Sequence, residues 1–223
     1  MKSDLHLISD PFRFPDWCVR IGRSSAWRSA RELSASELTE QLTCPKSLTL
    51  RLQQQFGKSF RFRQICQGWQ PAATAVWYVL GGSKRPWALL RTVAMYREQK
   101  LCVVAQSAIP AAAIAGKLRR LRCLGDQPLG KILHKIGRTS RTAFQFAVVR
   151  TESPLGPSRF CWARRSVLQS LGHRIPVMEV FLDPDIIGLR GNVVSQVEND
   201  AHRFRLAFDR ATHPFQDTAT RLC

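Results

Sequence analysis

A short polar connection between two apolar segments does most to restrict the folds open to this chain. Arg97-Glu-Gln-Lys100 separates the segments Trp87–Tyr96 and Leu101–Ser107. Both segments have the residue types and lengths of β-strands, and a polar connection of this length suits a hairpin. The two segments are therefore predicted to pair as antiparallel strands. Their apolar content is high on both faces.

Two short helices are predicted before this hairpin. A capping box at Ser34 and Glu37 starts the first helix, and Pro45 ends it. The second helix follows at once and should end at Gly57. Its apolar face repeats every fourth residue, at Leu48, Leu52 and Phe56.

Further strands and helices are indicated by the spacing of apolar residues. Alternation, or an apolar run bounded by turn residues, predicts strands. These strands are expected at Ser59–Gly68, Ala143–Val149, Phe160–Leu168 and Ile175–Leu182. Helical spacing predicts one helix after Pro110 and another at Leu129–Ile136. The apolar stripe of the first is formed by Ile114, Leu118 and Leu121.

Together these elements predict an α+β fold. We expect a single domain over residues 33–184, with a central antiparallel sheet and helices grouped on one side. Residues 1–32 show no clear periodicity and are expected to form a weakly structured N-terminal extension. Residues 185–223 are expected to form a C-terminal extension with one amphipathic helix. The apolar face of that helix consists of Val193, Val197, Ala201, Phe204 and Phe208.

The strong positive charge is compatible with several classes of partner. There are 34 Lys and Arg residues against 16 Asp and Glu, which gives a formal net charge of +18 and a pI near 10.8. This charge suits nucleic acid, another anionic partner or a small anionic substrate. No recognition motif or basic tail accompanies it, so nucleic acid is not expected as the main partner. Peripheral contact with a membrane stays open. The densest basic patch is formed by Lys117, Arg119, Arg120 and Arg122, for which a solvated helix face is the simpler interpretation.

Several common chemical signatures are absent from the sequence. Charged or polar residues interrupt every apolar run, and the N-terminal residues lack the apolar centre of a secretory signal, so a cytoplasmic protein is predicted. We expect a monomer. The seven cysteines include no C-x-x-C pair, and the five histidines show no ligand spacing. There is no Gly-rich phosphate loop and no G-x-S-x-G motif. Hydrolase, kinase and metalloenzyme functions are therefore disfavoured, and no metal is expected.

Two charged residues stand within apolar strands. Arg91 shares a strand face with Leu89 and Val93, and Glu179 shares one with Val177 and Phe181. An isolated charge in such surroundings is costly, so each needs a partner of opposite sign or a ligand. A structural ion pair, or two edge positions open to water, would explain the pattern as well as a binding site would. The pattern itself does not name a ligand.

Short motifs follow one another from Ser47 to Leu182. They are Ser47-Leu-Thr-Leu-Arg-Leu-Gln-Gln-Gln-Phe-Gly-Lys58, Gly68-Trp69, Ala105-Gln-Ser-Ala-Ile-Pro110, Leu124-Gly-Asp-Gln-Pro-Leu-Gly130, Trp162-Ala-Arg-Arg-Ser166 and Met178-Glu-Val-Phe-Leu182. In order and spacing they resemble the motifs of the chorismate pyruvate-lyase family of ubiquinone biosynthesis. Leu124–Gly130 is the most specific of them, and Arg141 stands at the expected distance beyond it.

The resemblance implies a cofactor-free carbon–oxygen lyase. Such an enzyme would eliminate pyruvate from chorismate and leave 4-hydroxybenzoate for ubiquinone biosynthesis. By this resemblance Arg91 would hold the ring carboxylate in a bidentate contact. Glu179 would hydrogen-bond the oxygen at C4 of the ring, as a neutral acid if its apolar setting raises its pKa. The backbone at Leu129 and near Leu48 would complete the grip on chorismate or 4-hydroxybenzoate.

Gln106 departs from the pattern of the family. It stands where the family has an arginine that would meet the enolpyruvyl carboxylate. A neutral amide in place of that charge would cost on the order of 1 to 2 kcal/mol. Gln106→Arg is therefore predicted to raise turnover. Three functions stay open: an active lyase, a catalytically impaired relative that binds 4-hydroxybenzoate or a similar aromatic acid, and a basic nucleic-acid or anion-binding protein that reuses the fold.

Overall fold

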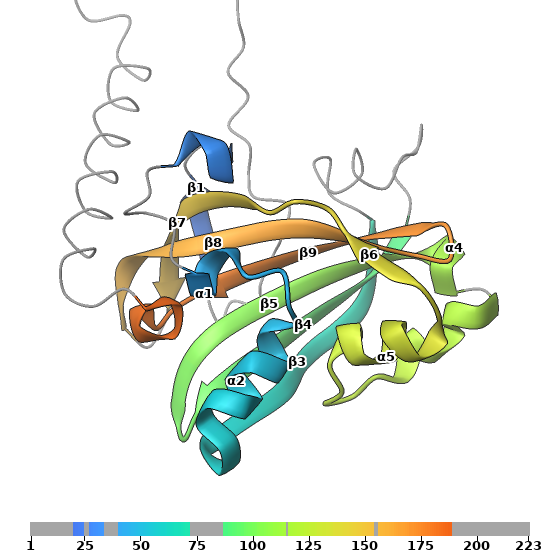
Figure 1. Cartoon of the computed structure of the whole chain (residues 1–223), viewed down its shortest axis with the longest axis horizontal. Helices are drawn as coiled ribbons and strands as arrows, with labels where there is room; N and C mark the ends of the chain where they lie inside the picture. Colours follow the sequence, from blue (N-terminus) through green and yellow to red (C-terminus); the bar gives the residue numbers. More distant parts are fainter. Residues whose placement is uncertain are drawn as a thin grey trace, which may run out of the picture.

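An antiparallel sheet organises the described part of the chain (Figure 1). This computed structural model describes residues 20–24, 27–33, 40–71, 87–114, 116–153 and 156–188. The nine strands among them follow the order β1-β7-β8-β9-β5-β4-β3, while β2 pairs with β7 and β6 pairs with β8. The strands are β1 Arg20–Ser24, β2 Arg28–Ser29, β3 Phe60–Pro71, β4 Trp87–Arg97, β5 Lys100–Pro110, β6 Thr139–Arg141, β7 Gln145–Ser153, β8 Gly156–Ser170 and β9 His173–Phe181.

The hairpin predicted from the sequence is formed by β4 and β5, which lie between β3 and β9 in the sheet. The two strands pair from Ala88 opposite Pro110 to Arg97 opposite Lys100. The connection is shorter than predicted because the ladder continues through Arg97 and Lys100. Glu98 takes a left-handed backbone conformation, with φ of 56°, to close this tight turn. The hairpin prediction is confirmed.

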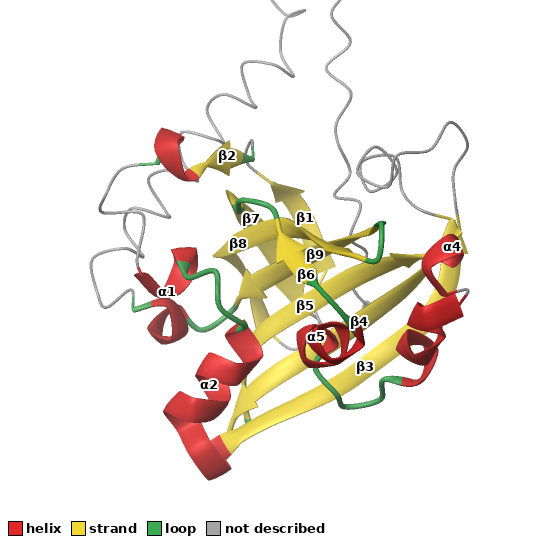
Figure 2. Ribbon diagram, turned by 45° about the vertical axis from the view of Figure 1, so that its right-hand side comes forward, coloured by secondary structure: helices red, strands yellow, loops and turns green. Residues whose placement is uncertain are grey.

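The helices that position the cavity described below lie on one face of the sheet. Figure 2 shows α2 and α5 on the same side of the strands, with α1 near the start of α2. The predicted α+β class, with helices grouped to one side of an antiparallel sheet, is therefore confirmed. The α-helices are α1 Glu40–Thr43, α2 Leu48–Phe56, α4 Ala111–Ile114 and α5 Leu129–Ile136. The 3-10 helices are η1 Ala30–Glu32, η2 Gly57–Ser59, η3 Gly116–Cys123 and η4 Pro184–Ile187.

The ends of α2 follow from its flanking residues. Ser47 caps the start, where its hydroxyl oxygen accepts from the backbone N–H of Leu50 at 3.4 Å. Gly57 ends the helix with φ of +52°, a conformation that favours glycine. Leu48 and Leu52 are buried, as their spacing predicts. The start of α2 is thereby held against the sheet, and it walls the cavity described below.

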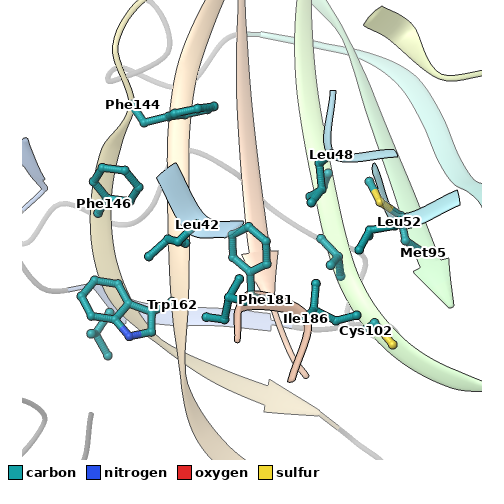
Figure 3. Packing of buried hydrophobic residues seen from close by; sticks show 14 of the residues in the cluster. Leu42, Leu48, Leu52, Met95, Cys102, Phe144, Phe146, Trp162, Phe181 and Ile186 are labelled. Atoms are coloured by element: carbon teal, nitrogen blue, oxygen red, sulfur yellow. The ribbon is translucent and has the colours of Figure 1, made fainter. Parts of the chain in front are cut away.

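The core between the helices and the sheet explains why these short helices are stable. Leu42 of α1 and Leu52 of α2 pack in one cluster with Phe181 of β9 and Met95 of β4 (Figure 3). Leu42, Leu52 and Phe181 are almost fully buried. Burial of side chains of this size contributes about 1.5 to 3 kcal/mol each, more than the intrinsic stability of a single helical turn.

Two elements differ from the sequence prediction. β3 continues past Gly68 to Pro71, because Gly68 keeps its place in the ladder opposite Leu90. After Pro110 the chain forms α4 and then η3 instead of one continuous helix. Gly116, with φ of +65°, starts the second piece in a conformation that a continuous α-helix does not contain.

The sheet also extends beyond the predicted domain boundary at residue 33. β1 and β2 add to its edge by pairing with β7. β7 continues to Ser153 and β8 starts at Gly156, so both are longer than predicted. Pairing with a distant strand supplies hydrogen bonds that no local pattern reveals. The capping box at Ser34 and Glu37, and the apolar repeat between Val193 and Phe208, lie outside the described residues.

Candidate active site

A cavity of about 260 Å³ lies between the sheet and its helices. Strands β3, β4, β5 and β9 line one side, and the start of α2, α5 and β6 line the other. Arg91 and Glu179 both line this cavity. The strand register explains why: Arg91 stands opposite Ser107, and Ser107 stands opposite Val177, two residues from Glu179. The two charged side chains therefore project from the same face of the sheet.

Arg91 is held in place by three protein acceptors. Its Nε donates to Gln64 Oε1 at 3.0 Å, and its Nη2 donates to the carbonyl oxygens of Gly125 and Gln127, both at 2.8 Å. Its Nη1 makes no hydrogen bond within the described residues. Burial lowers the pKa of Arg91 to about 10, against the opposing effect of Asp126, so the guanidinium remains charged at neutral pH. Within the described residues, the hydrogens left for a ligand are those of Nη1. The bidentate contact with a ring carboxylate stays a prediction.

The first turn of α5 lies next to this guanidinium. Gly125 and Gln127, which hold Arg91, belong to the turn just before α5, and Leu129 and Gly130 line the cavity. Pro128 stands at the N-cap and provides no side-chain cap, so the first N–H groups of α5 have no acceptor within the helix. Such a helix start favours an anion.

Leu48, at the start of α2, lines the same cavity. It begins α2 as Leu129 begins α5, and both side chains are buried and line the cavity. The structure therefore brings both residues to the cavity where Arg91 and Glu179 are found. The cavity is also bordered by apolar side chains of the sheet, which give it walls suited to a ring.

Glu179 has a partner that sequence reasoning did not assign. Arg164 of β8, only 1% exposed, donates from Nε to Glu179 Oε2 at 2.5 Å. Its Nη1 donates to the carbonyl oxygens of Leu42 at 2.7 Å and Cys44 at 3.2 Å. The structural ion pair considered for Glu179 therefore exists, and its cation is Arg164. Through the two carbonyls, Arg164 also ties the end of α1 to the floor of the site.

The charge state of Glu179 differs from the one considered from the sequence. Burial alone would raise the pKa of Glu179, but the nearby cations Arg164 and Arg141, with the hydrogen bond from Arg164, bring it below its ordinary value. Glu179 is therefore an ionised carboxylate at neutral pH. The proposal of a neutral acid is corrected, because it rested on an apolar setting without the two arginines.

Arg141 brings a further positive charge to the cavity. It lines the cavity from β6 and donates from Nη1 to the hydroxyl of Ser166 at 2.5 Å. Its guanidinium carbon lies 5.2 Å from the centre of the Phe144 ring. Burial lowers the pKa of Arg141, and the charge of Glu179 opposes that effect. The site therefore combines Arg91 on one side with Arg141 near Glu179 on the other.

Gln106 stands where the family resemblance would place an arginine, and its side chain bonds within the sheet. The residue is among those that border the cavity, but its Nε2 donates to Thr92 Oγ1 at 2.9 Å. Thr92 stands directly opposite Gln106 in the ladder and next to Arg91 in the chain. Because neighbouring residues of a strand point to opposite faces, the Gln106 amide is directed away from Arg91 and Glu179. The role of Gln106 in substrate binding stays a prediction.

Arg164 could have been suspected from the motif Trp162-Ala-Arg-Arg-Ser166. Two consecutive arginines in a strand place one side chain on each face, so one of them must enter the covered face. Which of the two does so depends on the register: Arg164 stands opposite Glu179, whereas Arg165 stands opposite Met178. That pairing is long-range information, which a single sequence does not contain.

Among the described residues, no three His, Cys, Asp or Glu side chains gather as a metal site. Within the same part of the chain, none of the helices has the length and apolarity needed to span a membrane. The fold and the cavity define the class of protein: an α+β domain with a small cavity lined by two arginines and a carboxylate.

Comparison with known proteins identifies the family. The model of the family described as chorismate lyase matches residues 22–190. This protein belongs to the chorismate lyase family. It is 32% identical over 146 residues to a probable chorismate pyruvate-lyase of Methylococcus capsulatus, a match that covers 61% of this chain and 88% of that protein.

Other relatives match over similar lengths. A probable chorismate pyruvate-lyase of Thiobacillus denitrificans is 30% identical over 176 residues, or 75% of this chain and 94% of that protein. A chorismate pyruvate-lyase of Sodalis glossinidius is 34% identical over 147 residues, or 65% and 76%. Among solved structures, a GntR-family transcriptional regulator from Bacillus cereus has a TM-score of 0.45 and 13% identity, covering 60% of this chain and 98% of that one.

Proposed function

We propose that this protein is a chorismate pyruvate-lyase, which converts chorismate into 4-hydroxybenzoate and pyruvate and so supplies 4-hydroxybenzoate for ubiquinone biosynthesis. The observation that carries the proposal is the meeting of Arg91, Glu179 and the first turn of α5 at one cavity. Its volume of about 260 Å³ lies just below the range typical of drug-sized ligands, which suits a single ring with short substituents. All lining residues fall within 33–184, the segment that we take as the catalytic unit.

The reaction requires little chemistry from side chains. The bond between C3 of the ring and the ether oxygen breaks, C4 loses its hydrogen as a proton, and the enolpyruvyl group gains a proton to become pyruvate. Aromatisation of the ring supplies the driving force. The enzyme must hold the substrate, exclude water and stabilise charge at the departing oxygen. A partly enclosed cavity with fixed charges meets these needs.

Arg91 and α5 together form the site for the ring carboxylate. The Nη1 hydrogens of Arg91 would donate to one carboxylate oxygen, and the N–H groups of Leu129 and Gly130 would donate to the other. This assignment is supported by the carbonyls of Gly125 and Gln127, which hold Arg91 beside the start of α5. Because the guanidinium is already held, little conformational entropy would be lost on binding.

Glu179 acts as a hydrogen-bond acceptor for the hydroxyl at C4. Its Oε2 accepts from Arg164, which leaves Oε1 for the substrate. Since Arg164 and Arg141 keep the pKa of Glu179 low, the carboxylate accepts a hydrogen bond from the hydroxyl and does not donate one. Arg164 is a positioning residue in this scheme: it sets the orientation and charge of Glu179 without a contact of its own to the ring.

Arg141 is our candidate for the cation that meets the enolpyruvyl carboxylate. It lines the cavity near Glu179, so it is on the side of the ring substituents and away from Arg91. Chorismate carries two carboxylates and 4-hydroxybenzoate carries one. A cation that meets the second carboxylate would therefore bind the substrate more strongly than the product.

The proposal is tested by incubating the purified chain with chorismate and following 4-hydroxybenzoate and pyruvate together. We expect equal amounts of both products and, for Arg91→Met, a kcat/KM at least a hundredfold lower, about 2.7 kcal/mol or more. Arg61→Met is the matched control, because Arg61 is an exposed arginine of the neighbouring strand β3, and it should leave kcat/KM unchanged.

Absence of product from the wild-type protein at high enzyme concentration would refute the lyase proposal. The same protein would then be tested for thermal stabilisation by 4-hydroxybenzoate. Stabilisation that disappears in Arg91→Met would identify a protein that binds 4-hydroxybenzoate without turnover. That function is the catalytically impaired relative considered in the sequence analysis. If the protein neither converts chorismate nor binds 4-hydroxybenzoate, both the lyase proposal and the binding-protein alternative are refuted.

A further inference from the structure

A second hollow lies outside the candidate active site, between η3 and α5. This η3–α5 groove has a volume of about 920 Å³. Its cations are Lys117, Arg119, Arg120 and Lys135, and its apolar lining includes Leu124 and Ile132. None of the residues that line it is acidic. The proposed reaction does not use it.

The positive charge of the groove has no partner within the described residues. All four cationic side chains are exposed, and none of them forms an ion pair with a described residue. By contrast, Arg63, Arg97 and Lys100, which lie outside the groove, pair with aspartates. Four like charges around one hollow repel one another unless an anion occupies it.

The apolar lining decides what kind of anion fits. Ile132 is half-buried and Leu124 is buried at the wall of the groove, so an occupant would touch hydrocarbon as well as charge. A small free anion would gain little, because no charged side chain of the groove is buried enough to enclose it. Single-stranded nucleic acid binds on aromatic platforms, and the lining contains none. Exposed cations above an apolar wall suit phosphate headgroups whose acyl chains lie beneath them.

We propose that the η3–α5 groove is a docking surface for a membrane that contains anionic phospholipids. α5 stands between the groove and the active-site cavity: Ile132 and Lys135 face the groove, while Leu129 and Gly130 line the cavity. A docked membrane would therefore rest against the helix that walls the cavity. The interaction is peripheral and does not depend on the proposed reaction, so either proposal can fail while the other holds.

The test is co-sedimentation of the full chain with vesicles. Vesicles of phosphatidylcholine alone are compared with vesicles of phosphatidylcholine and phosphatidylglycerol at moderate salt. We expect binding only to the vesicles with phosphatidylglycerol. Each basic side chain near such a surface strengthens binding about fivefold. Replacing Lys117, Arg119, Arg120 and Lys135 by serine should therefore weaken binding several hundredfold.

The matched control removes the same number of charges elsewhere. Lys46, Lys58, Arg61 and Arg174 are exposed and do not line the groove, so their replacement by serine gives the same net charge. This control variant should bind the anionic vesicles at least tenfold more tightly than the groove variant. Near-UV circular dichroism establishes that both variants are folded.

Three results would overturn the proposal. Equal weakening of the two variants would show that net charge alone attracts the membrane. No binding of the wild type to phosphatidylglycerol vesicles would exclude a membrane partner. Displacement of the protein from vesicles by a short single-stranded RNA at equal charge concentration would identify nucleic acid as the partner of the groove.

Discussion

Removal of Arg164 is the most informative single perturbation of this site. Arg164→Met keeps much of the apolar stem but deletes the guanidinium, which donates to Glu179, Leu42 and Cys44. Glu179 is then left as a carboxylate that is 6% exposed. Breaking a buried ion pair by removing one partner costs about 3 to 5 kcal/mol. Arg141 still attracts the carboxylate, so we expect a loss of about 3 kcal/mol in the free energy of unfolding.

A double-mutant cycle separates the ion pair from the other effects of Arg164. Glu179→Leu alone leaves Arg164 as a buried cation, and it should also cost about 3 kcal/mol. The variant that combines Arg164→Met with Glu179→Leu buries neither charge, so it should cost at least about 2 kcal/mol less than the sum of the two single changes. The measurement is urea unfolding at neutral pH, followed by circular dichroism. Additivity within about 0.5 kcal/mol would refute the coupling.

The same pair makes a prediction about pH. Since the folded protein lowers the pKa of Glu179, the pair stabilises the fold above the ordinary glutamate pKa. This contribution is lost as the pH falls through the lowered value. In Arg164→Met burial is opposed mainly by Arg141, so the pKa should rise and the acid-induced loss of stability should shrink. An identical dependence of unfolding free energy on pH in both proteins would contradict this.

Catalysis gives a measurement that a purely structural role of Arg164 would not change. If Glu179 must be ionised, the acidic limb of the pH profile of kcat/KM should move to higher pH in Arg164→Met. Arg164→Lys keeps the charge but cannot reach the carboxylate and both carbonyls together, so it should fall between the wild type and Arg164→Met. It also serves if Arg164→Met does not fold. A lower rate with an unchanged pH profile would count against the positioning role.

Three further substitutions test the assignments within the cavity. Arg91→Lys should weaken binding of 4-hydroxybenzoate at least tenfold by isothermal titration, since one ammonium cannot satisfy three protein acceptors and a carboxylate; unchanged affinity would remove Arg91 from the binding site. Gln106→Arg should lower the free energy of unfolding by about 3 kcal/mol without raising turnover, because the new charge would be buried beside Thr92. Higher turnover would support the sequence-based interpretation, in which an arginine at position 106 meets the enolpyruvyl carboxylate. Arg141→Met should raise KM for chorismate about tenfold or more and change the affinity for 4-hydroxybenzoate much less. The control Arg165→Met, on the other face of the sheet, should change neither. Equal losses of affinity for substrate and product would refute the contact between Arg141 and the enolpyruvyl carboxylate.

The sequence predicted those elements whose signals are local. The α2 helix from Leu48 to Phe56 was predicted from the spacing of apolar residues and from Gly57, and α5 from Leu129 to Ile136 was predicted from spacing. The hairpin of β4 and β5 was predicted from its short polar connection. β1 and β2 were not predicted, because their stability comes from pairing with β7, far away in the chain.

The candidate site was predicted in the same partial way. Alternation within single strands placed Arg91 and Glu179 on faces with apolar neighbours, and both line the cavity. Gln106 shows the limit of this reasoning. Its motif position indicated a binding role, but the face to which its amide points follows from its place opposite Thr92 in the ladder.

The order of residues along the chain determined the periodicity, the helix ends and the family resemblance, since each depends on neighbours within a few positions. The tertiary structure alone decided that Arg164, and neither Arg91 nor Arg165, pairs with Glu179. It also decided that Glu179 is ionised, because a pKa depends on the charges and the burial around a group. Those surroundings arise only when β8, β9 and the end of α1 meet.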